Sequence, residues 1–196
     1  MIRSTIEDLC TDLEREFRRD PQGTRVARIL AQFSSDLSAG SPDWRDWVFF
    51  EEQTYTRNLL HRCGAFELLL LCWEPGQESP IHDHAGMHCW MSVLEGGMQE
   101  VHYRQAAPNT PLVEGRVQSF ECGQVGYIVD DIALHLVRPS RGERGVSLHL
   151  YSSPIDACRT FDPLTGEARL TEVGYHSVRG ELCAEKSAEA VRAEWV

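Results

Sequence analysis

The chain has 196 residues, 42% of them hydrophobic, and carries a formal net charge of −11 at pH 7. This length suits one domain with a sizeable core, and the composition is ordinary for a soluble globular protein. The negative charge argues against nucleic acid or an anionic membrane surface as a partner, because the field repels both. No apolar run approaches the roughly 20 residues of a membrane span, and the start of the chain reads as an amphipathic helix rather than a signal peptide, so we expect a cytoplasmic protein.

The N-terminal part, residues 1–48, is expected to be mostly helical. Residues 5–19 place apolar side chains at helical spacing, with acidic residues near the start that suit the helix dipole. A second helical pattern covers about residues 24–33. Residues 34–42 are rich in Ser, Gly and Pro, which predicts a loop.

The residue pattern changes after residue 48, where short apolar runs separated by Gly and Pro predict many strands. These runs are residues 66–73, 90–94, 99–103, 117–120, 127–129 and 146–151. Such a pattern predicts a mainly β fold, a barrel or sandwich over residues 49–180, rather than a parallel α/β sheet. We expect all 196 residues to form a single domain, with residues 181–196 as a tail that is helical or frayed between 184 and 195.

The seven cysteines make an odd count and include no Cys-x-x-Cys spacing. Both features argue against a disulfide framework or a zinc finger. We therefore expect reduced thiols, most of them small buried side chains in a reducing compartment.

The pattern His82-Asp83-His84 predicts a metal site. Side chains alternate along a strand, so His82 and His84 point one way and Asp83 points the other. Two imidazoles at this spacing suit iron, zinc, copper or nickel about equally. A third ligand is needed, and His135, in an apolar strand-like run, is the candidate. Taken alone, a histidine in such a run is more often part of the core.

The spacing of these residues resembles the cupin family of small jelly-roll barrels. Gly76, His82, His84 and Gly96 occupy the places of its first motif, and Cys89 stands where the family usually has a metal-binding glutamate. A site of neutral histidines without a carboxylate keeps the full charge of a divalent metal. It therefore favours an anionic ligand such as a thiolate. Iron would permit oxidation of a small thiol with O2, whereas zinc has no redox chemistry.

Five stretches of the chain, in order, resemble the cysteine dioxygenases of the thiol dioxygenase family. They are residues 55–59 (Tyr-Thr-Arg-Asn-Leu), 71–73 (Leu-Cys-Trp), 81–84 with 88–89 (Ile-His-Asp-His and His-Cys), 147–151 (Ser-Leu-His-Leu-Tyr), and 161–162 with 165–166 (Phe-Asp and Thr-Gly). The resemblance implies a cupin barrel that binds Fe(II) through His82, His84 and His135. It also implies that L-cysteine binds the metal through sulfur and amine.

The same resemblance implies that Arg57 pairs with the carboxylate of L-cysteine and that Tyr55 is a hydrogen-bonding neighbour in the pocket. A guanidinium binds a carboxylate with two parallel hydrogen bonds, which a lysine cannot reproduce. Without the resemblance, a solvated surface charge would be the ordinary interpretation of Arg57.

Cys89 and Tyr151 match the cysteine and tyrosine that form a thioether crosslink in eukaryotic-type members of this family. The crosslink would fix the Tyr151 hydroxyl near the substrate, and the resemblance makes His149 its hydrogen-bond partner. His149 and Tyr151 share a face if this stretch is a strand. The alternatives are a buried thiol for Cys89 and a core aromatic for Tyr151.

The chain departs from the family pattern at two places. Pro139 stands where an asparagine commonly follows the third histidine, which removes a supporting hydrogen bond but no ligand. Relatives often have Ser-Pro-Pro after the tyrosine, whereas this chain has Ser152-Ser153-Pro154. A cis bond between two non-proline residues costs about 2.5–4 kcal/mol, so the sequence leaves the geometry after Tyr151 open.

The sequence thus predicts an iron enzyme that oxidises L-cysteine with O2 to cysteine sulfinate and that is a monomer, the usual state of the family. One alternative is a dioxygenase of 3-mercaptopropionate, a group that commonly has glutamine at the position of Arg57. The other is a cupin that binds a metal and a small ligand without chemistry. That second alternative gives no reason for Arg57, Cys89, His149 and Tyr151 to occur together.

Overall fold

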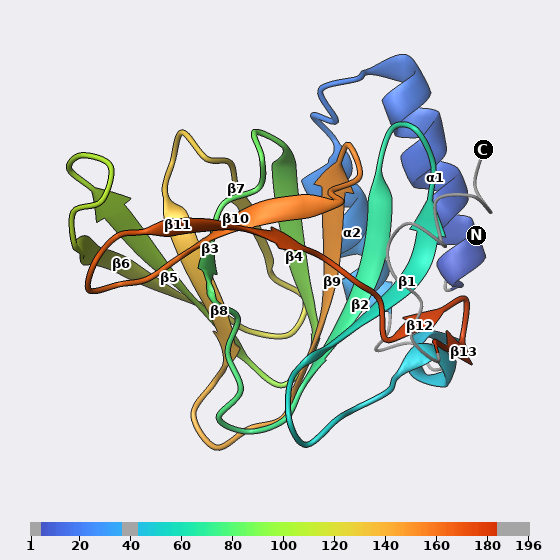
Figure 1. Cartoon of the computed structure of the whole chain (residues 1–196). Coiled ribbons are helices and arrows are strands. Elements are labelled where there is room, and N and C mark those ends of the chain that lie inside the picture. The colour runs from blue at the N-terminus through green and yellow to red at the C-terminus, as the bar shows by residue number, and fades with distance from the viewer. Residues whose placement is uncertain (1–4, 37–42, 184–196) are drawn as a thin grey trace.

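A computed structural model describes residues 5–36 and 43–183 (Figure 1). The chain begins with helix α1 (Ile6–Arg19), which Thr5 caps by accepting a hydrogen bond from the Asp8 backbone N–H at 3.1 Å. Acidic residues in the first turn and arginines in the last turn complement the helix dipole. Helix α2 (Val26–Asp36) and a short 3-10 helix, η2 (Asp43–Trp47), follow. The helical start that the sequence predicts is confirmed.

Thirteen strands and the loops between them form the rest of the described chain. The strands are β1 (Thr56–Arg62), β2 (Glu67–Trp73), β3 (Ile81–His82), β4 (His88–Glu95), β5 (Met98–Gln105), β6 (Leu112–Phe120), β7 (Val125–Ile128), β8 (Leu134–Pro139), β9 (Gly145–Ser152), β10 (Ala157–Phe161), β11 (Ala168–Glu172), β12 (Ser177–Val178) and β13 (Glu181–Leu182). A seven-stranded sheet has the order β13-β12-β1-β2-β9-β4-β7, and a six-stranded sheet has the order β11-β10-β3-β8-β5-β6. The predicted mainly β fold with N-terminal helices is confirmed.

The residues of strand β2 contribute to two hydrophobic cores, one on each face of the seven-stranded sheet. All seven of its residues are buried, because helices cover one face of the seven-stranded sheet and the other sheet faces the opposite side. Leu68, Leu70 and Cys72 pack with the helices, while Leu69, Leu71 and Trp73 point into the barrel. The continuous apolar run is therefore still an alternating strand.

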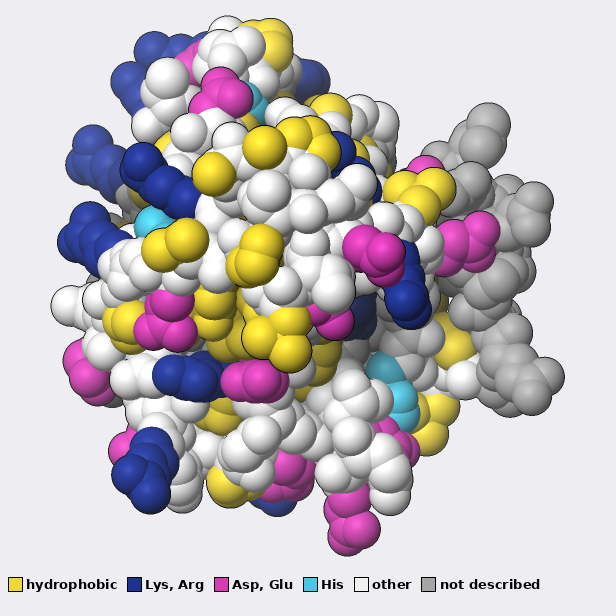
Figure 2. Space-filling model, turned by 60° about the vertical axis from the view of Figure 1, so that its left-hand side comes forward, with side chains coloured by type: hydrophobic (Ala, Val, Ile, Leu, Met, Phe, Trp, Pro, Cys, Tyr) yellow, Lys and Arg dark blue, Asp and Glu magenta, His cyan; other side chains and the backbone are white. Residues whose placement is uncertain are grey.

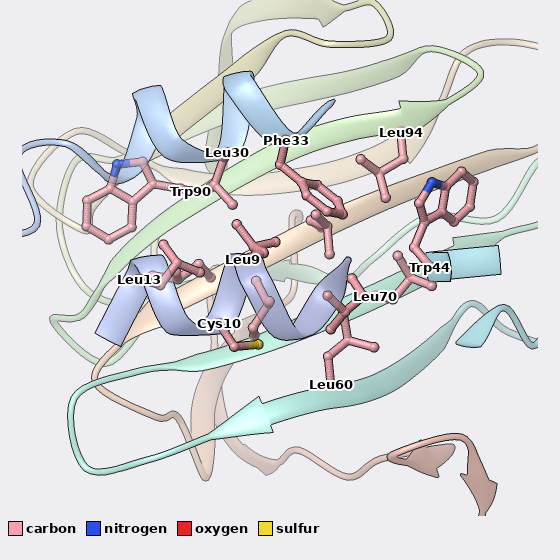
Figure 3. Packing of buried hydrophobic residues seen from close by; sticks show 14 of the residues in the cluster. Leu9, Cys10, Leu13, Leu30, Phe33, Trp44, Leu60, Leu70, Trp90 and Leu94 are labelled. Carbon is pink, nitrogen blue, oxygen red and sulfur yellow. The ribbon is translucent and has the colours of Figure 1, made fainter. Parts of the chain in front are cut away.

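The core under the helices joins α1, α2 and η2 to the outer face of the seven-stranded sheet (Figure 3). Leu13 and Leu30 from the helices, Trp44 from η2 and Leu70 from β2 are almost completely buried in it. This packing places the helices on the far side of the sheet from the barrel interior. The interior is thus left to a second apolar cluster and to the polar residues of the site.

The six-stranded sheet has exposed edges. Figure 2 shows hydrophobic side chains gathered on the face that the left-hand side of Figure 1 presents, with charged side chains beside them. Among the described residues, Val113 and Val117 of edge strand β6 and Leu170 of edge strand β11 are exposed. Strand β11 leads directly to the segment that lines the site described below.

Two predicted boundaries need comment. Helix α2 continues to Asp36, so the predicted loop start at Ser34 is wrong. The Ser34 hydroxyl is satisfied inside the helix, because it donates to the Leu30 carbonyl at 2.9 Å and lies 2.6 Å from the Ser92 hydroxyl. The predicted helix at residues 184–195 lies outside the described residues. Within the described residues, no helix is long and apolar enough to cross a membrane.

Candidate active site

Three histidines, two from β3 and the turn after it and one from β8, converge inside the barrel. Strands β3 and β8 pair so that His82 lies directly opposite His135, and their Nε2 atoms are 3.2 Å apart. His84 follows in the turn after β3 rather than on the strand. The nitrogen atoms that the three rings offer all lie within 4.8 Å of one another. The structure thus brings together the three residues that the sequence predicts as ligands.

An oxygen atom lies close to Nδ1 of each imidazole ring. The acceptor is the Pro80 carbonyl for His82 at 2.9 Å and the Glu100 carboxylate for His135 at 2.7 Å. For His84, Asp130 Oδ1 lies 3.5 Å from Nδ1. These oxygens favour a proton on Nδ1, which leaves Nε2 with a free lone pair for a metal.

The protonation of the rings suits metal binding. Burial, followed by the nearby His84, lowers the pKa of His82 to about 3. Burial and the neighbouring imidazoles also hold the pKa of His135 well below its usual value. Both nitrogens of His84 are buried and hydrogen-bond to no described residue. The neutral rings of His82 and His135, together with the converging nitrogen of His84, fit a divalent metal such as Fe(II) or Zn(II).

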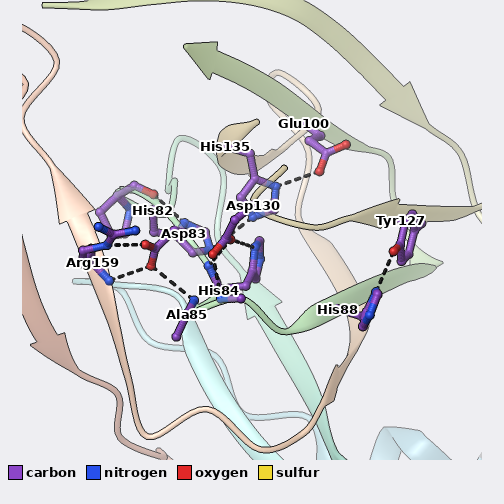
Figure 4. Close-up of polar contacts among 12 residues, drawn as sticks. His82, Asp83, His84, Ala85, His88, Glu100, Tyr127, Asp130, His135 and Arg159 are labelled. Carbon is purple, nitrogen blue, oxygen red and sulfur yellow. Dashed lines mark hydrogen bonds and ion pairs between the residues drawn. The ribbon is translucent and has the colours of Figure 1, made fainter. Parts of the chain in front are cut away.

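Two carboxylates compensate part of the charge that a metal would bring here (Figure 4). Glu100 of β5 contacts His135, and Asp130 in the β7–β8 connection accepts hydrogen bonds from the backbone N–H groups of His84 and Gly86, both at 2.7 Å. Asp83 points the other way, as predicted, and pairs with Arg159. Sequence reasoning missed Glu100 and Asp130. The signal was available in part, since Glu100 is an acidic residue at an inward position of a strand.

Arg57 and Tyr55 line the same cavity as His82 and His84. The cavity has a volume of about 170 Å³, the scale of a small metabolite. Arg57 has only 15% of its side chain exposed, and its guanidinium lies 5.7 Å from the centre of the Tyr151 ring. The Tyr55 ring stacks on Trp73, with centroids 4.3 Å apart. A buried cation beside three metal-binding nitrogens suits a ligand with an anionic end and a metal-binding end.

Cys89 and Tyr151 are direct neighbours across two strands. They are register partners in the β4–β9 ladder, and they are 2% and 4% exposed. Side chains opposite each other in an antiparallel ladder have Cβ atoms about 4.5–5.5 Å apart. Burial raises the pKa of both the thiol and the phenol, so both are protonated at neutral pH. The placement agrees with the predicted pair, and the covalent crosslink stays a prediction.

His149 belongs to a short hydrogen-bonded chain. The Trp73 indole N–H donates to the Ser147 hydroxyl at 3.0 Å, and that hydroxyl lies 3.0 Å from His149 Nε2. The centre of the His149 ring lies 6.2 Å from that of Tyr151. The predicted hydrogen bond between His149 and the Tyr151 phenol stays a prediction, and Ser147 is a contact that the sequence did not reveal. The peptide bond between Ser152 and Ser153, which the sequence left open, is cis.

Comparison with known proteins places this site in a family. Residues 2–163 match the family model described as cysteine dioxygenase type I. The chain belongs to the cysteine dioxygenase type I family. Cysteine dioxygenase type 1 of Danio rerio is 36% identical over 187 residues, covering 92% of this chain and 90% of that protein. Cysteine dioxygenase type 1 of Homo sapiens is 34% identical over 180 residues, covering 90% and 88%.

A solved structure similar to this chain is a Klebsiella pneumoniae protein with a double-stranded β-helix domain. It is 14% identical, covers 70% of this chain and 93% of its own, and has a TM-score of 0.47, too low to add to the argument. The predicted family is therefore confirmed by sequence relatives. Within the chain, the part matched by the cysteine dioxygenase type I model contains every predicted site residue. Val173 and Gly174, which follow β11 and also line the cavity, lie beyond the matched part of the chain.

Proposed function

We propose that this protein is an Fe(II)-dependent dioxygenase that converts L-cysteine and O2 to L-cysteine sulfinate. The observation that carries the proposal is the largely buried Arg57 guanidinium, which lines one small cavity with His82 and His84, two of the three converging imidazoles. The names of the similar proteins, cysteine dioxygenase type 1, support the same reaction. Oxidation of a thiol to a sulfinic acid removes four electrons from sulfur, and O2 accepts four, so no further reductant is needed.

The metal would be held by His82, His84 and His135, and when bound it would supply open positions for a thiolate and for O2. Arg57 binds the substrate carboxylate and sets the orientation of the amino acid in the cavity. Burial keeps the Tyr151 phenol protonated, so it donates a hydrogen bond toward the reacting sulfur and oxygen atoms.

The finer features of the site belong to the same proposal. Cys89 and Tyr151 form a thioether between the sulfur and a ring carbon: the S–H bond and one ring C–H bond break, and O2 takes up the two protons and two electrons to give hydrogen peroxide. Their direct opposition in the β4–β9 ladder supports this bond. Mass spectrometry of the tryptic digest tests it, since the linked peptides weigh two hydrogen atoms less than the two free peptides together. Cys89→Ser should abolish the linked species.

A cytoplasmic monomer acting on small molecules completes the proposal. All seven cysteines lie in the described part of the chain and none of them is in a disulfide, which supports a reducing compartment. The net charge of −11 disfavours nucleic acid as a partner.

Oxygen uptake by the iron-loaded protein tests the function, with L-cysteine, 3-mercaptopropionate and cysteamine compared in parallel. We expect L-cysteine to give the fastest uptake and a product heavier by two oxygen atoms. Arg57→Ala should weaken L-cysteine binding at least about tenfold, which is about 1.4 kcal/mol. Faster turnover of 3-mercaptopropionate would favour the sibling activity, and no uptake with any thiol would favour a binding module. An unchanged affinity in Arg57→Ala would refute the carboxylate assignment.

A further inference from the structure

The segment between β11 and β12, residues 173–176, begins at the wall of the cavity, and we call it the strap. It runs across the front of Figure 1 from β11 toward β12. Val173 and Gly174 line the cavity together with Glu172 at the end of β11. The Val173 N–H donates to the Asp156 carbonyl at 3.0 Å, and the His176 N–H donates to the Arg57 carbonyl at 2.8 Å. The strap is therefore joined on one side to β1, the strand that carries Arg57.

The strap also holds the Arg57 side chain. The Arg57 Nε–H donates to the Gly174 carbonyl at 3.2 Å, across 117 residues of sequence. A guanidinium has five N–H donors in a fixed plane, so a bond at Nε determines where the two terminal nitrogens point. The position of the Gly174 carbonyl therefore determines how Arg57 presents itself to a ligand.

The next residue of the strap, Tyr175, is tied to a buried carboxylate. Its hydroxyl donates to Glu67 Oε2 at 2.6 Å and accepts from Arg62 Nη1 at 2.6 Å. Glu67 has no exposed surface, and it also accepts from Arg62 Nη1 at 3.0 Å and from the Ile155 backbone N–H at 3.3 Å. A buried carboxylate with this many donors is held firmly, since leaving any of them unpaired is costly.

Glu67 lies between the strap and the catalytic residues. Its second oxygen, Oε1, is 3.9 Å from Arg57 Nη2. In the sheet, Glu67 is the register partner of Arg62 on β1 and of Tyr151 on β9, so these three side chains share the inward face. The contacts of Glu67 thus run from Tyr175 of the strap to the guanidinium of Arg57.

We propose that Tyr175 and Glu67 are positioning residues for Arg57, because they seat the strap so that the Gly174 carbonyl and the Glu67 carboxylate together orient the guanidinium toward the substrate carboxylate. This inference rests on the proposed function of Arg57. It assigns a role in recognition to a strap that lies after the part of the chain matched by the family model. Neither Tyr175 nor Glu67 is required to contact the substrate.

The test compares two thiols that differ at the carboxylate. Dissociation constants of L-cysteine and cysteamine, which lacks the carboxylate, are measured by anaerobic calorimetry on the iron-loaded wild type and Tyr175→Phe. In Tyr175→Phe we expect the affinity for L-cysteine to fall about tenfold, equivalent to about 1.4 kcal/mol, and the affinity for cysteamine to change less than about twofold. Tyr103→Phe is the matched control, because Tyr103 packs against a separate apolar cluster formed by Ile81, Val101 and Leu136, and it should leave both constants unchanged.

Two further variants separate positioning from a general loss of structure. In an Arg57→Ala background, Tyr175→Phe should cause no additional loss for L-cysteine, because the guanidinium through which it acts is gone. Glu67→Asp keeps the charge but withdraws the carboxylate by one methylene, and it should reproduce the selective loss. Unfolding midpoints measured alongside show whether the folded state is retained.

The proposal is overturned if Tyr175→Phe weakens both thiols equally, leaves L-cysteine affinity unchanged, or adds its full effect in the Arg57→Ala background. Each of these results would make Tyr175 and Glu67 structural only. If Arg57→Ala alone leaves L-cysteine affinity unchanged, the assignment of Arg57 under the proposed function fails instead. The two failures are thus distinguishable in one set of measurements.

Discussion

Replacing Glu100 by glutamine tests whether the carboxylate behind His135 contributes to metal binding. Glu100 Oε1 lies 2.7 Å from His135 Nδ1, and both side chains are nearly fully buried, at 4% and 3% exposure. Its other oxygen is 3.1 Å from His102 Nε2. Glutamine keeps an oxygen that can accept from Nδ1–H but removes the charge. The variant therefore isolates the electrostatic part of the interaction.

The expected effect follows from the strength of charged hydrogen bonds. A hydrogen bond to a charged group contributes about 1.5–3 kcal/mol, against about 0.5–1.5 kcal/mol for a neutral one. The difference of about 1–1.5 kcal/mol corresponds to about a 5- to 12-fold weaker metal affinity. This lies near the lower end of the roughly 10- to 100-fold losses found when the outer contacts of metal ligands are removed.

Competition against a coloured chelator measures the affinity, with Fe(II) under anaerobic conditions and Zn(II) as a redox-inert comparison. Glu114→Gln is the matched control, since Glu114 is exposed on the neighbouring strand β6. We expect the control to bind metal like the wild type. Wild-type affinity in Glu100→Gln, or an equal loss in Glu114→Gln, would refute the reasoning that Glu100 supports His135.

Three further predictions concern stability, each measured by chemical denaturation. Burial raises the pKa of Asp130, but the nearby His84 ring and hydrogen bonds from the backbone N–H groups of His84 and Gly86 outweigh it and hold the pKa at about 2. Asp130→Asn should therefore cost about 1 kcal/mol above about pH 4, and the deficit relative to wild type should disappear as the pH falls through about 2; a pH-independent deficit would contradict this. Leu70→Ala, at a fully buried site under the helices, should lower the free energy of unfolding by about 2–5 kcal/mol, and a loss below about 1 kcal/mol would show that the core collapses to fill the space. Gly96→Ala should lower the free energy of unfolding by about 2 kcal/mol or more, because φ is +68° at Gly96 and a Cβ there would lie 2.2 Å from a backbone oxygen. An unchanged denaturation midpoint would mean that the turn relaxes.

Much of the fold was accessible from local patterns. The helical spacing in α1, and the short apolar runs between Gly and Pro, predicted elements that the structure contains. The residue types that carry chemistry were also recognisable, since a His-x-His pair and a lone arginine in a matching motif have few roles. Alternation along β9 correctly placed His149 and Tyr151 on one face. Each of these features depends on residues close together in the sequence.

The contacts that complete the site were not accessible in this way. Glu100 meets His135 from 35 residues away, and the Gly174 carbonyl meets Arg57 from 117 residues away. Alternation tells which face of a strand a side chain occupies, but it does not tell which strand lies beside it. Chain order gives little help, because β9 lies between β2 and β4 in the sheet. A backbone carbonyl such as that of Gly174 leaves no signal at all in residue type.

The sequence by itself thus determined the chemical groups of this protein, namely three imidazoles, a guanidinium, a thiol and a phenol, together with the strands that carry them. Only the tertiary structure decided which residues contact those groups. The carboxylates of Glu100, Asp130 and Glu67 are examples, and so is the strap. The physical reason is that periodicity is a local property of the backbone, whereas hydrogen-bond partners depend on how distant strands pair when the two sheets close around the buried interior.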